Sequence, residues 1–131
     1  YKKNKLTLIQ ASLTYRDERF YGYDTACVVE VIEHLEPARI RAFERVLFEY
    51  AMPKQVILTT PNREYNVKYQ GMEEGALRHK DHRFEWTREE FRAWTAHVCE
   101  TFGYQVQISG IGDEEKSVGA PTQMGVFVKC G

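Results

Sequence analysis

The sequence predicts an α/β domain built on a mainly parallel β-sheet. Residues 24–32 and 55–60 are rich in apolar side chains, as is typical of parallel strands covered on both faces. Between them, residues 37–50 carry apolar side chains at helical spacing, so strands and helices alternate along the middle of the chain. Ligands of such sheets bind beyond the carboxyl ends of the strands. We therefore expect a functional site among the residues that follow the two apolar runs.

The composition indicates one folded domain. The chain has 131 residues, enough for a hydrophobic core, and 43% of them are hydrophobic. A net charge of -1 gives no general attraction to polyanions, so nucleic-acid contacts require local basic patches. No apolar run approaches the roughly 20 residues of a membrane span. Cys27 and Cys99 lie in apolar patterns without CxxC spacing, which favours reduced core thiols in a cytoplasmic protein.

The first half of the chain predicts two strands and a helix. Residues 6–13 form a short strand, and the polar and aromatic residues 14–23 connect it to the next element. Residues 24–32 form the central buried strand. The helix begins at Pro37, a residue suited to a first helical turn, and ends before Pro53. The second buried strand, already identified, follows this helix.

The second half of the chain predicts a long loop, a helix and two strands. Residues 63–83 show no periodicity, and about twenty residues without regular structure inside a domain often form a functional loop. Thr87 and Glu90 have the spacing of a capping box and start a helix that Gly103 ends. The last two strands are predicted over residues 104–108 and 124–129.

Two carboxylates and an imidazole stand at the end of the predicted central strand. Glu30, Glu33 and His34 are spaced i, i+3 and i+4, so they share a face if the backbone turns helically near Ile32. In a continuing strand, Glu30 and Glu33 would face opposite sides. A charged residue after an apolar run is disfavoured unless it is at the strand end or paired. The pattern predicts half of a metal site, and the alternative is a helix N-terminus that favours acidic residues.

The long loop contains the residues that could complete such a site. If it folds over the strand end, His79 or His82 completes a set of two carboxylates and two imidazoles, which suits Mn²⁺, Fe²⁺, Co²⁺ or Zn²⁺ more than Ca²⁺. The alternative is a solvated, charged loop. The loop is also the densest basic region of the chain, so an anionic substrate is expected beside the metal. Phe84 and Trp86, which follow the loop, are predicted to anchor it in the core.

Several segments together resemble a known family. They are VVEVIEHL, FERVLFEYA, ILTTPNREYN, LRHKDHRFEWTREEFRAW, GYQVQISGIG and PTQMGVF. These segments look like the catalytic domain of the Hen family, the small-RNA 3′-terminal ribose 2′-O-methyltransferases, and are most similar to the bacterial members that mark RNA during repair. The ExxEH turn and the DHRFEWTREEF segment are its most specific parts. The resemblance implies the C-terminal portion, strands 3 to 7, of a Rossmann-like class I methyltransferase fold with an antiparallel last strand.

The resemblance also implies an activity and a site. Family members transfer a methyl group from S-adenosylmethionine to the 2′-oxygen of the 3′-terminal ribose, with a divalent metal, Mn²⁺ before Mg²⁺. By motif match the metal ligands are Glu30, Glu33, His34 and His82. The metal would bind the terminal 2′- and 3′-hydroxyls and lower the pKa of the 2′-hydroxyl. His79 is the candidate to accept the proton or to support the ligands. The RNA phosphates are assigned to Arg63, Arg78, Lys80 and Arg83.

Part of the family's cofactor site has no counterpart in this sequence. Rossmann-like methyltransferases hold S-adenosylmethionine on a glycine-rich loop after their first strand, and the sequence has no such loop. The resemblance therefore implies that residues 1–131 are a partial methyltransferase domain of a longer polypeptide, or that they pair with another copy or fragment. In the family's strand order, 3-2-1-4-5-7-6, the strand at residues 24–32 would have a bare edge, which invites association. The remaining cofactor contacts would be Ser12, Leu13, Val29 and Glu30.

Two other functions stay open at the level of sequence. A Glu and His cluster beside a basic loop also suits a metal-dependent phosphoesterase. A fragment without the cofactor-binding half could instead be a non-catalytic RNA 3′-end-binding module. For a methyltransferase of this family, the resemblance implies a polynucleotide kinase-phosphatase and a ligase of RNA repair as partners.

Overall fold

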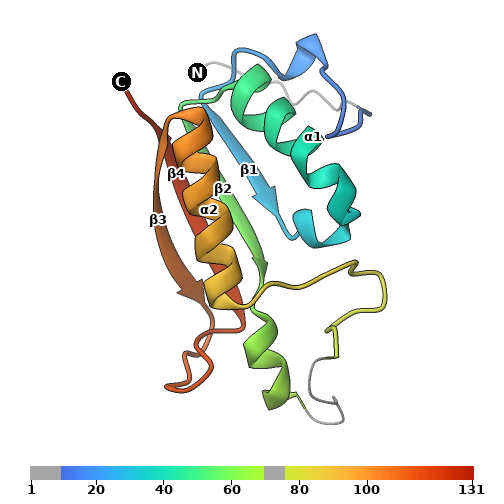
Figure 1. Cartoon of the computed structure of the whole chain (residues 1–131), viewed down its shortest axis with the longest axis vertical. Helices are drawn as coiled ribbons and strands as arrows, with labels where there is room; N and C mark the ends of the chain where they lie inside the picture. The colour runs from blue at the N-terminus through green and yellow to red at the C-terminus, as the bar shows by residue number, and fades with distance from the viewer. Residues whose placement is uncertain (1–9, 70–75) are drawn as a thin grey trace, which may run out of the picture.

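The structure, a computed structural model, describes residues 10–69 and 76–131 and contains a four-stranded mixed sheet (Figure 1). The order of the strands is β1-β2-β4-β3. β1 and β2 are parallel, whereas β4 runs antiparallel to both of its neighbours. The α/β class and the antiparallel last strand are confirmed, and β4 lies between β2 and β3, so that β1, β2 and β3 share one direction and β1 with β2 is the parallel pair among the described strands. The strands are β1 Thr25–Val29, β2 Gln55–Pro61, β3 Tyr104–Ile111 and β4 Thr122–Lys129.

Two helical segments pack on this sheet. The first begins with a 3₁₀ turn at Pro37–Arg39, continues as α1 (Ile40–Glu44) and ends as a π-helix, η4 (Arg45–Ala51). The second is α2 (Arg88–Phe102), whose predicted capping box and C-terminal glycine are both present. Within the described residues, no helix combines the length and apolar content that crossing a membrane requires.

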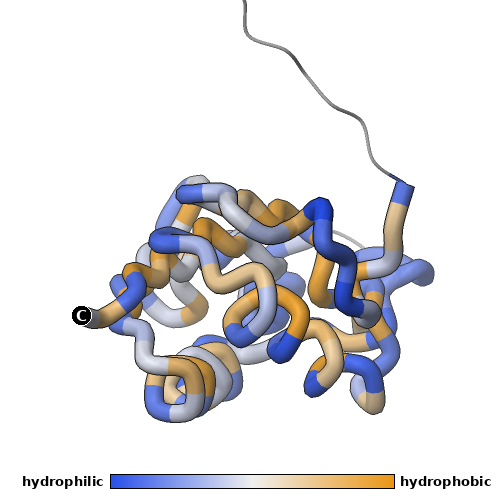
Figure 2. The backbone as a smooth tube through the Cα atoms, turned by 90° about the horizontal axis from the view of Figure 1, so that it is seen from above, coloured by the Kyte–Doolittle hydropathy of each residue, from blue (hydrophilic) through white to orange (hydrophobic). Residues whose placement is uncertain are grey.

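Both helical segments cover the same face of the sheet, and the hydrophobic core lies between these helices and the sheet. Val56, Leu58 and Phe127 point to this face from β2 and β4 and are fully buried. Phe48 of η4 meets Phe127 with ring centroids 5.1 Å apart, and Trp94 of α2 with centroids 6.4 Å apart. Hydrophobic and hydrophilic stretches alternate along the tube, as expected for elements with one face on a core (Figure 2).

The strand predicted over residues 6–13 is absent from the part of that segment that the structure describes. Of residues 6–13, the first four lie outside the described residues, and residues 10–13 form irregular backbone and the start of a turn. The strand predicted as central is an edge strand, β1, because in the described part of the chain it pairs with β2 alone, in agreement with the bare edge that the family's strand order implies.

Cys27 is also placed differently from the prediction. It is paired with Ile57 of β2, which is paired in turn with Val126 of β4, on the face that α1 and α2 leave uncovered, and it is exposed. The prediction of a core thiol at this position is therefore wrong. Cys99 on α2 is half-buried, and burial raises the pKa of its thiol.

Candidate metal centre

The chain turns sharply where β1 ends. Glu30 adopts a left-handed conformation, with φ of 54°, which costs a residue with a Cβ about 1 kcal/mol. Its N–H still donates to the carbonyl oxygen of Thr59 on β2, at 3.1 Å. A 3₁₀ turn, Ile32–His34, follows directly. The predicted change from strand to helical turn is confirmed, with the strand ending at Val29 rather than near Ile32.

This turn buries the carboxylate of Glu33. Its side chain is fully buried, and Oε1 accepts a hydrogen bond from Thr60 Oγ1 at 2.8 Å. Oε2, in contrast, is buried without a hydrogen-bond partner. An unpaired buried carboxylate oxygen is costly, so its presence in a folded protein calls for a ligand or a function.

Two imidazole nitrogens face this unpaired oxygen. Nε2 of His34 lies 3.7 Å from Glu33 Oε2, and Nε2 of His82 lies 3.9 Å from it. Ligand atoms of these three residues all lie within 4.8 Å of one another. A divalent ion binds such atoms at about 2.0–2.2 Å, so two of its ligands are separated by at most about 4.4 Å. The cluster therefore fits a divalent metal ion after small side-chain adjustments.

Glu30 lies beside the three-residue cluster rather than within it. It lines a hollow of about 430 Å³ together with His34, His79 and His82. Burial first, and then the negative charge of Glu33, raise the pKa of Glu30 to about 7. A cation shared by the two carboxylates would relieve their repulsion, so Glu30 remains a candidate fourth ligand.

The loop that carries His82 is fastened to the strand ends. The N–H of Arg83 donates to the Glu33 carbonyl oxygen at 2.7 Å, which places His82 over the turn. Phe84 packs on Trp86 and Trp86 on Trp94, with centroids 4.9 and 5.1 Å apart, so the predicted anchoring role of Phe84 and Trp86 is confirmed. The loop is less irregular than predicted, since it begins with a 3₁₀ helix, Arg63–Lys68.

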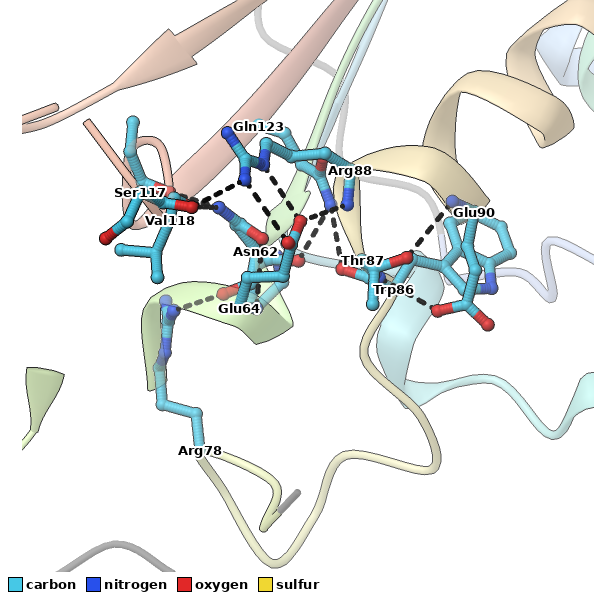
Figure 3. Close-up of polar contacts among 12 residues, drawn as sticks. Asn62, Glu64, Arg78, Trp86, Thr87, Arg88, Glu90, Ser117, Val118 and Gln123 are labelled. Carbon is cyan, nitrogen blue, oxygen red and sulfur yellow. Dashed lines mark hydrogen bonds and ion pairs between the residues drawn. The ribbon is translucent and has the colours of Figure 1, made fainter. Parts of the chain in front are cut away.

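Asn62 joins the end of β2 to the loop that precedes β4 (Figure 3). Its fully buried amide donates to the carbonyl oxygens of Val118 and Ala120, at 2.7 and 2.8 Å, and accepts from the N–H of Glu64. Glu64 in turn binds the guanidinium of Arg88 at the start of α2, at 2.8 Å, and Arg88 lowers the pKa of Glu64. The network therefore links the end of β2, the loop before β4 and the start of α2.

We expect Asn62→Ala to lower the free energy of unfolding by about 2–3 kcal/mol, because it removes the hydrogen bonds that the Asn62 side chain makes to two carbonyl groups, one buried and one part-buried, and to one N–H. Urea denaturation followed by circular dichroism measures the change. Gln107→Ala, which removes an exposed amide from β3, is the matched control and should cost less than about 0.5 kcal/mol. Equal effects of the two substitutions would contradict the importance of this network.

The basic residues assigned to RNA have different environments. The Arg78 guanidinium donates to the carbonyl oxygens of Asn62 and Pro121 and to Asn66 Oδ1, so it holds the loop in place. Lys80 and Arg83 are exposed, and Arg63 is half-buried with its N–H bonded to the Trp86 carbonyl oxygen.

The predicted cofactor residues do not share one cavity among the described residues. Leu13 lines an apolar hollow of about 240 Å³ between β1 and η4. Ser12 lines a separate groove that also contains His34 and Arg83. Val29 is exposed at the end of β1.

Sequence reasoning missed two residues that shape the cluster, Thr60 and Glu85. Thr60 binds Glu33 as described, and Glu85 is buried with Oε2 2.5 Å from Nδ1 of His82. The signal for Glu85 was present in the sequence, because a carboxylate between two aromatic anchors must either be exposed or be paired in the core.

Comparisons with known proteins agree with this fold. No protein-family model matches the chain. The chain is 54% identical to the crystallised methyltransferase domain of bacterial CtHen1, with a TM-score of 0.83, over 95% of this chain and 62% of that one. It is 39% identical over 127 residues to a small RNA 2′-O-methyltransferase of Xenopus tropicalis, covering 95% of this chain and 34% of the relative.

A third similarity is to a chain in the structure of the Pnkp1/Rnl/Hen1 RNA repair complex, with 29% identity and a TM-score of 0.66 over 86% of this chain and 24% of that one. The chain thus spans about a third of the length of the first curated relatives and less than two thirds of the bacterial structure. The sheet is that of a class I methyltransferase domain. The chain belongs to the Hen1 family of small RNA 2′-O-methyltransferases.

Proposed function

We propose that this chain carries the metal-binding part of an enzyme that methylates the 2′-oxygen of the 3′-terminal ribose of RNA. The observation that carries the proposal is the buried, unpaired oxygen of Glu33 facing Nε2 of His34 and of His82. Mixed carboxylate and imidazole ligands suit Mn²⁺, and Mg²⁺ is the second candidate. The function of the similar proteins supports the choice of reaction.

Each side chain of the cluster has a distinct task in this proposal. Glu33, His34 and His82 would hold the divalent ion, with Glu30 as a fourth ligand. The ion supplies Lewis acidity that lowers the pKa of a bound hydroxyl, while S-adenosylmethionine supplies the methyl group. His34 is about half exposed, so the cluster has an open side from which the terminal ribose can approach. His79 lines the same hollow and is the candidate to take the proton of the 2′-hydroxyl.

The surroundings of the cluster suit an RNA end. We assign exposed Lys80 and Arg83 to the phosphates that precede the terminal nucleotide, with Arg63 as a further contact. Ser12, Leu13, Val29 and Glu30 would contribute to the S-adenosylmethionine site. Because the similar complex contains Pnkp1 and Rnl, we also propose that the enzyme protects RNA ends beside such repair proteins.

The decisive experiment measures transfer of a labelled methyl group from S-adenosylmethionine to a short RNA by the protein's full chain. We expect transfer with Mn²⁺ to an RNA that ends in a free 2′,3′-diol, and none with a 2′-deoxy end or a chelator. His82→Ala should lower the rate at least about 100-fold, whereas His97→Ala, on the exposed side of α2, should not.

Other outcomes separate the competing functions. Transfer that survives His82→Ala, or that accepts a 2′-deoxy end, would contradict the proposed site. Hydrolysis of RNA without the methyl donor would favour the phosphoesterase. Metal-dependent binding of RNA ends without turnover would favour a non-catalytic end-binding module.

A further inference from the structure

We propose that Glu85 is a positioning residue that fixes the tautomer of His82 and so turns its Nε2 lone pair toward Glu33. This inference rests on the proposed metal centre but not on methyl transfer itself. Glu85 is 2% exposed and lies on the far side of the His82 ring from the cluster. It contacts no predicted metal ligand other than His82 in the described contacts.

Three donors converge on the Glu85 carboxylate. Oε1 accepts from Asn66 Nδ2 at 2.6 Å, and Oε2 accepts from the Arg78 backbone N–H at 2.7 Å. Nδ1 of His82 lies 2.5 Å from the same Oε2. A carboxylate has only acceptor oxygens, so Nδ1 of His82 must carry the proton that fills this contact.

The orientation of the Asn66 side-chain amide fixes which atoms donate to Glu85 and which accept. Its Oδ1 accepts from Arg78 Nε at 2.9 Å, and its Nδ2 also donates to the Ala76 carbonyl oxygen at 3.2 Å. Turning the amide over would set donor against donor and acceptor against acceptor. Asn66 must therefore donate to Glu85, which leaves both carboxylate oxygens as acceptors.

The proton on Nδ1 determines the state of the other ring nitrogen of His82, Nε2. A neutral imidazole with a proton on Nδ1 has a free lone pair on Nε2, and that is the atom that faces Glu33 Oε2. The opposite tautomer would point an N–H at the cluster and could not bind a metal ion through Nε2. A buried acceptor behind a metal-binding imidazole typically contributes 10–100-fold to metal affinity.

The tautomer can be read directly in the unaltered protein. In ¹⁵N-histidine spectra of the metal-free full chain at about pH 8.5, above the usual imidazole pKa, we expect protonated Nδ1 and unprotonated Nε2 for His82. The reverse pattern would overturn the proposal. This measurement does not depend on a variant that folds.

Two variants separate positioning from a merely structural role. Glu85→Met has a similar length but no acceptor, so we expect loss of the fixed tautomer and Mn²⁺ binding weakened about 10–100-fold. Glu85→Gln can keep an oxygen opposite Nδ1, at the loss of the hydrogen bond from Asn66 Nδ2, and should retain the tautomer, with an affinity between those of Glu85→Met and of the unaltered protein. Electron paramagnetic resonance of free Mn²⁺ measures the affinities.

The matched control is Glu44, another buried carboxylate, which accepts from Trp94 Nε1 at 2.8 Å and lies 3.3 Å from His97 Nε2. Glu44→Met should leave Mn²⁺ affinity unchanged. Unchanged affinity in Glu85→Met would overturn the inference. Mn²⁺ binding that depends on Glu85 in a protein without methyl transfer would refute the proposed function and leave this inference standing.

Discussion

Glu33→Gln is expected to weaken Mn²⁺ binding at least about 100-fold and to abolish methyl transfer, while the metal-free protein becomes no less stable. The reason is the unpaired, buried Oε2 of Glu33. An amide nitrogen in its place can donate to Nε2 of His34 or His82, and the amide oxygen can still accept from Thr60. Removing an uncompensated buried charge typically gains about 1–2 kcal/mol.

The two effects require two measurements. Urea denaturation in a chelator gives the free energy of unfolding of the metal-free proteins, and a second series with Mn²⁺ gives the stabilisation by binding. At an ion concentration 100 times the dissociation constant of the unaltered protein, that protein should gain about 2.7 kcal/mol, and Glu33→Gln, with affinity at least about 100-fold weaker, should gain at most about 0.4 kcal/mol.

Glu36→Gln is the control for Glu33→Gln, because it removes an exposed carboxylate that lies just after the same turn and should change neither quantity. A Glu33→Gln protein that binds Mn²⁺ as tightly as the unaltered one would remove Glu33 from the ligand set. Strong destabilisation of the metal-free variant would instead show that Glu33 is a structural residue.

Elements that depend on local interactions were predictable from the sequence. The helix α2 starts after Thr87 and ends at Gly103 as predicted, because the capping box and the left-handed glycine act within one turn of the chain. The strand β2 and the helix before it follow in the same way from apolar spacing and from Pro37 and Pro53.

Features that depend on the neighbour of a segment were not predictable. An apolar run looks the same in a central and an edge strand, so the apolar pattern did not place β1 at the edge, although the family's strand order implied it, and the exposure of Cys27 followed only from the pairing of the sheet. The left-handed Glu30 carries no sequence signal, because that conformation is ordinarily a property of glycine.

The same distinction between local and long-range interactions applies to the candidate site. The spacing of Glu33 and His34 placed them on one turn, and the loop histidine His82 joined them once the aromatic anchors were in the core. The partners that orient these groups, Thr60 and Glu85, come from elsewhere in the chain and contact them only in the folded structure. The spacing of residues in the sequence therefore predicts candidate metal ligands better than it predicts the residues that orient those ligands.

Phe48→Ala should cause the largest loss of stability, about 3–5 kcal/mol. Phe48 is fully buried at the point where the π-helix, α2 and the sheet meet. Its ring lies 5.9 Å from that of Phe102, 5.2 Å from that of Tyr104 and 5.1 Å from that of Phe127. Truncation leaves a cavity lined by rigid aromatic rings, which collapse poorly, so the cost lies toward the upper end of the range.

Thermal and urea denaturation in chelator measure this loss, and two further variants define its origin. Phe48→Leu fills most of the cavity and should cost about 1–1.5 kcal/mol, whereas Tyr15→Ala removes a ring that is 64% exposed and should cost less than about 0.5 kcal/mol. Where Phe48→Ala remains folded, its Mn²⁺ affinity should be unchanged, because Phe48 contacts none of the cluster residues in the described contacts. Equal costs for the alanine and leucine variants would mean that the site relaxes around the missing ring, so that stability comes from burial of area rather than from the interlocking of the four aromatic side chains.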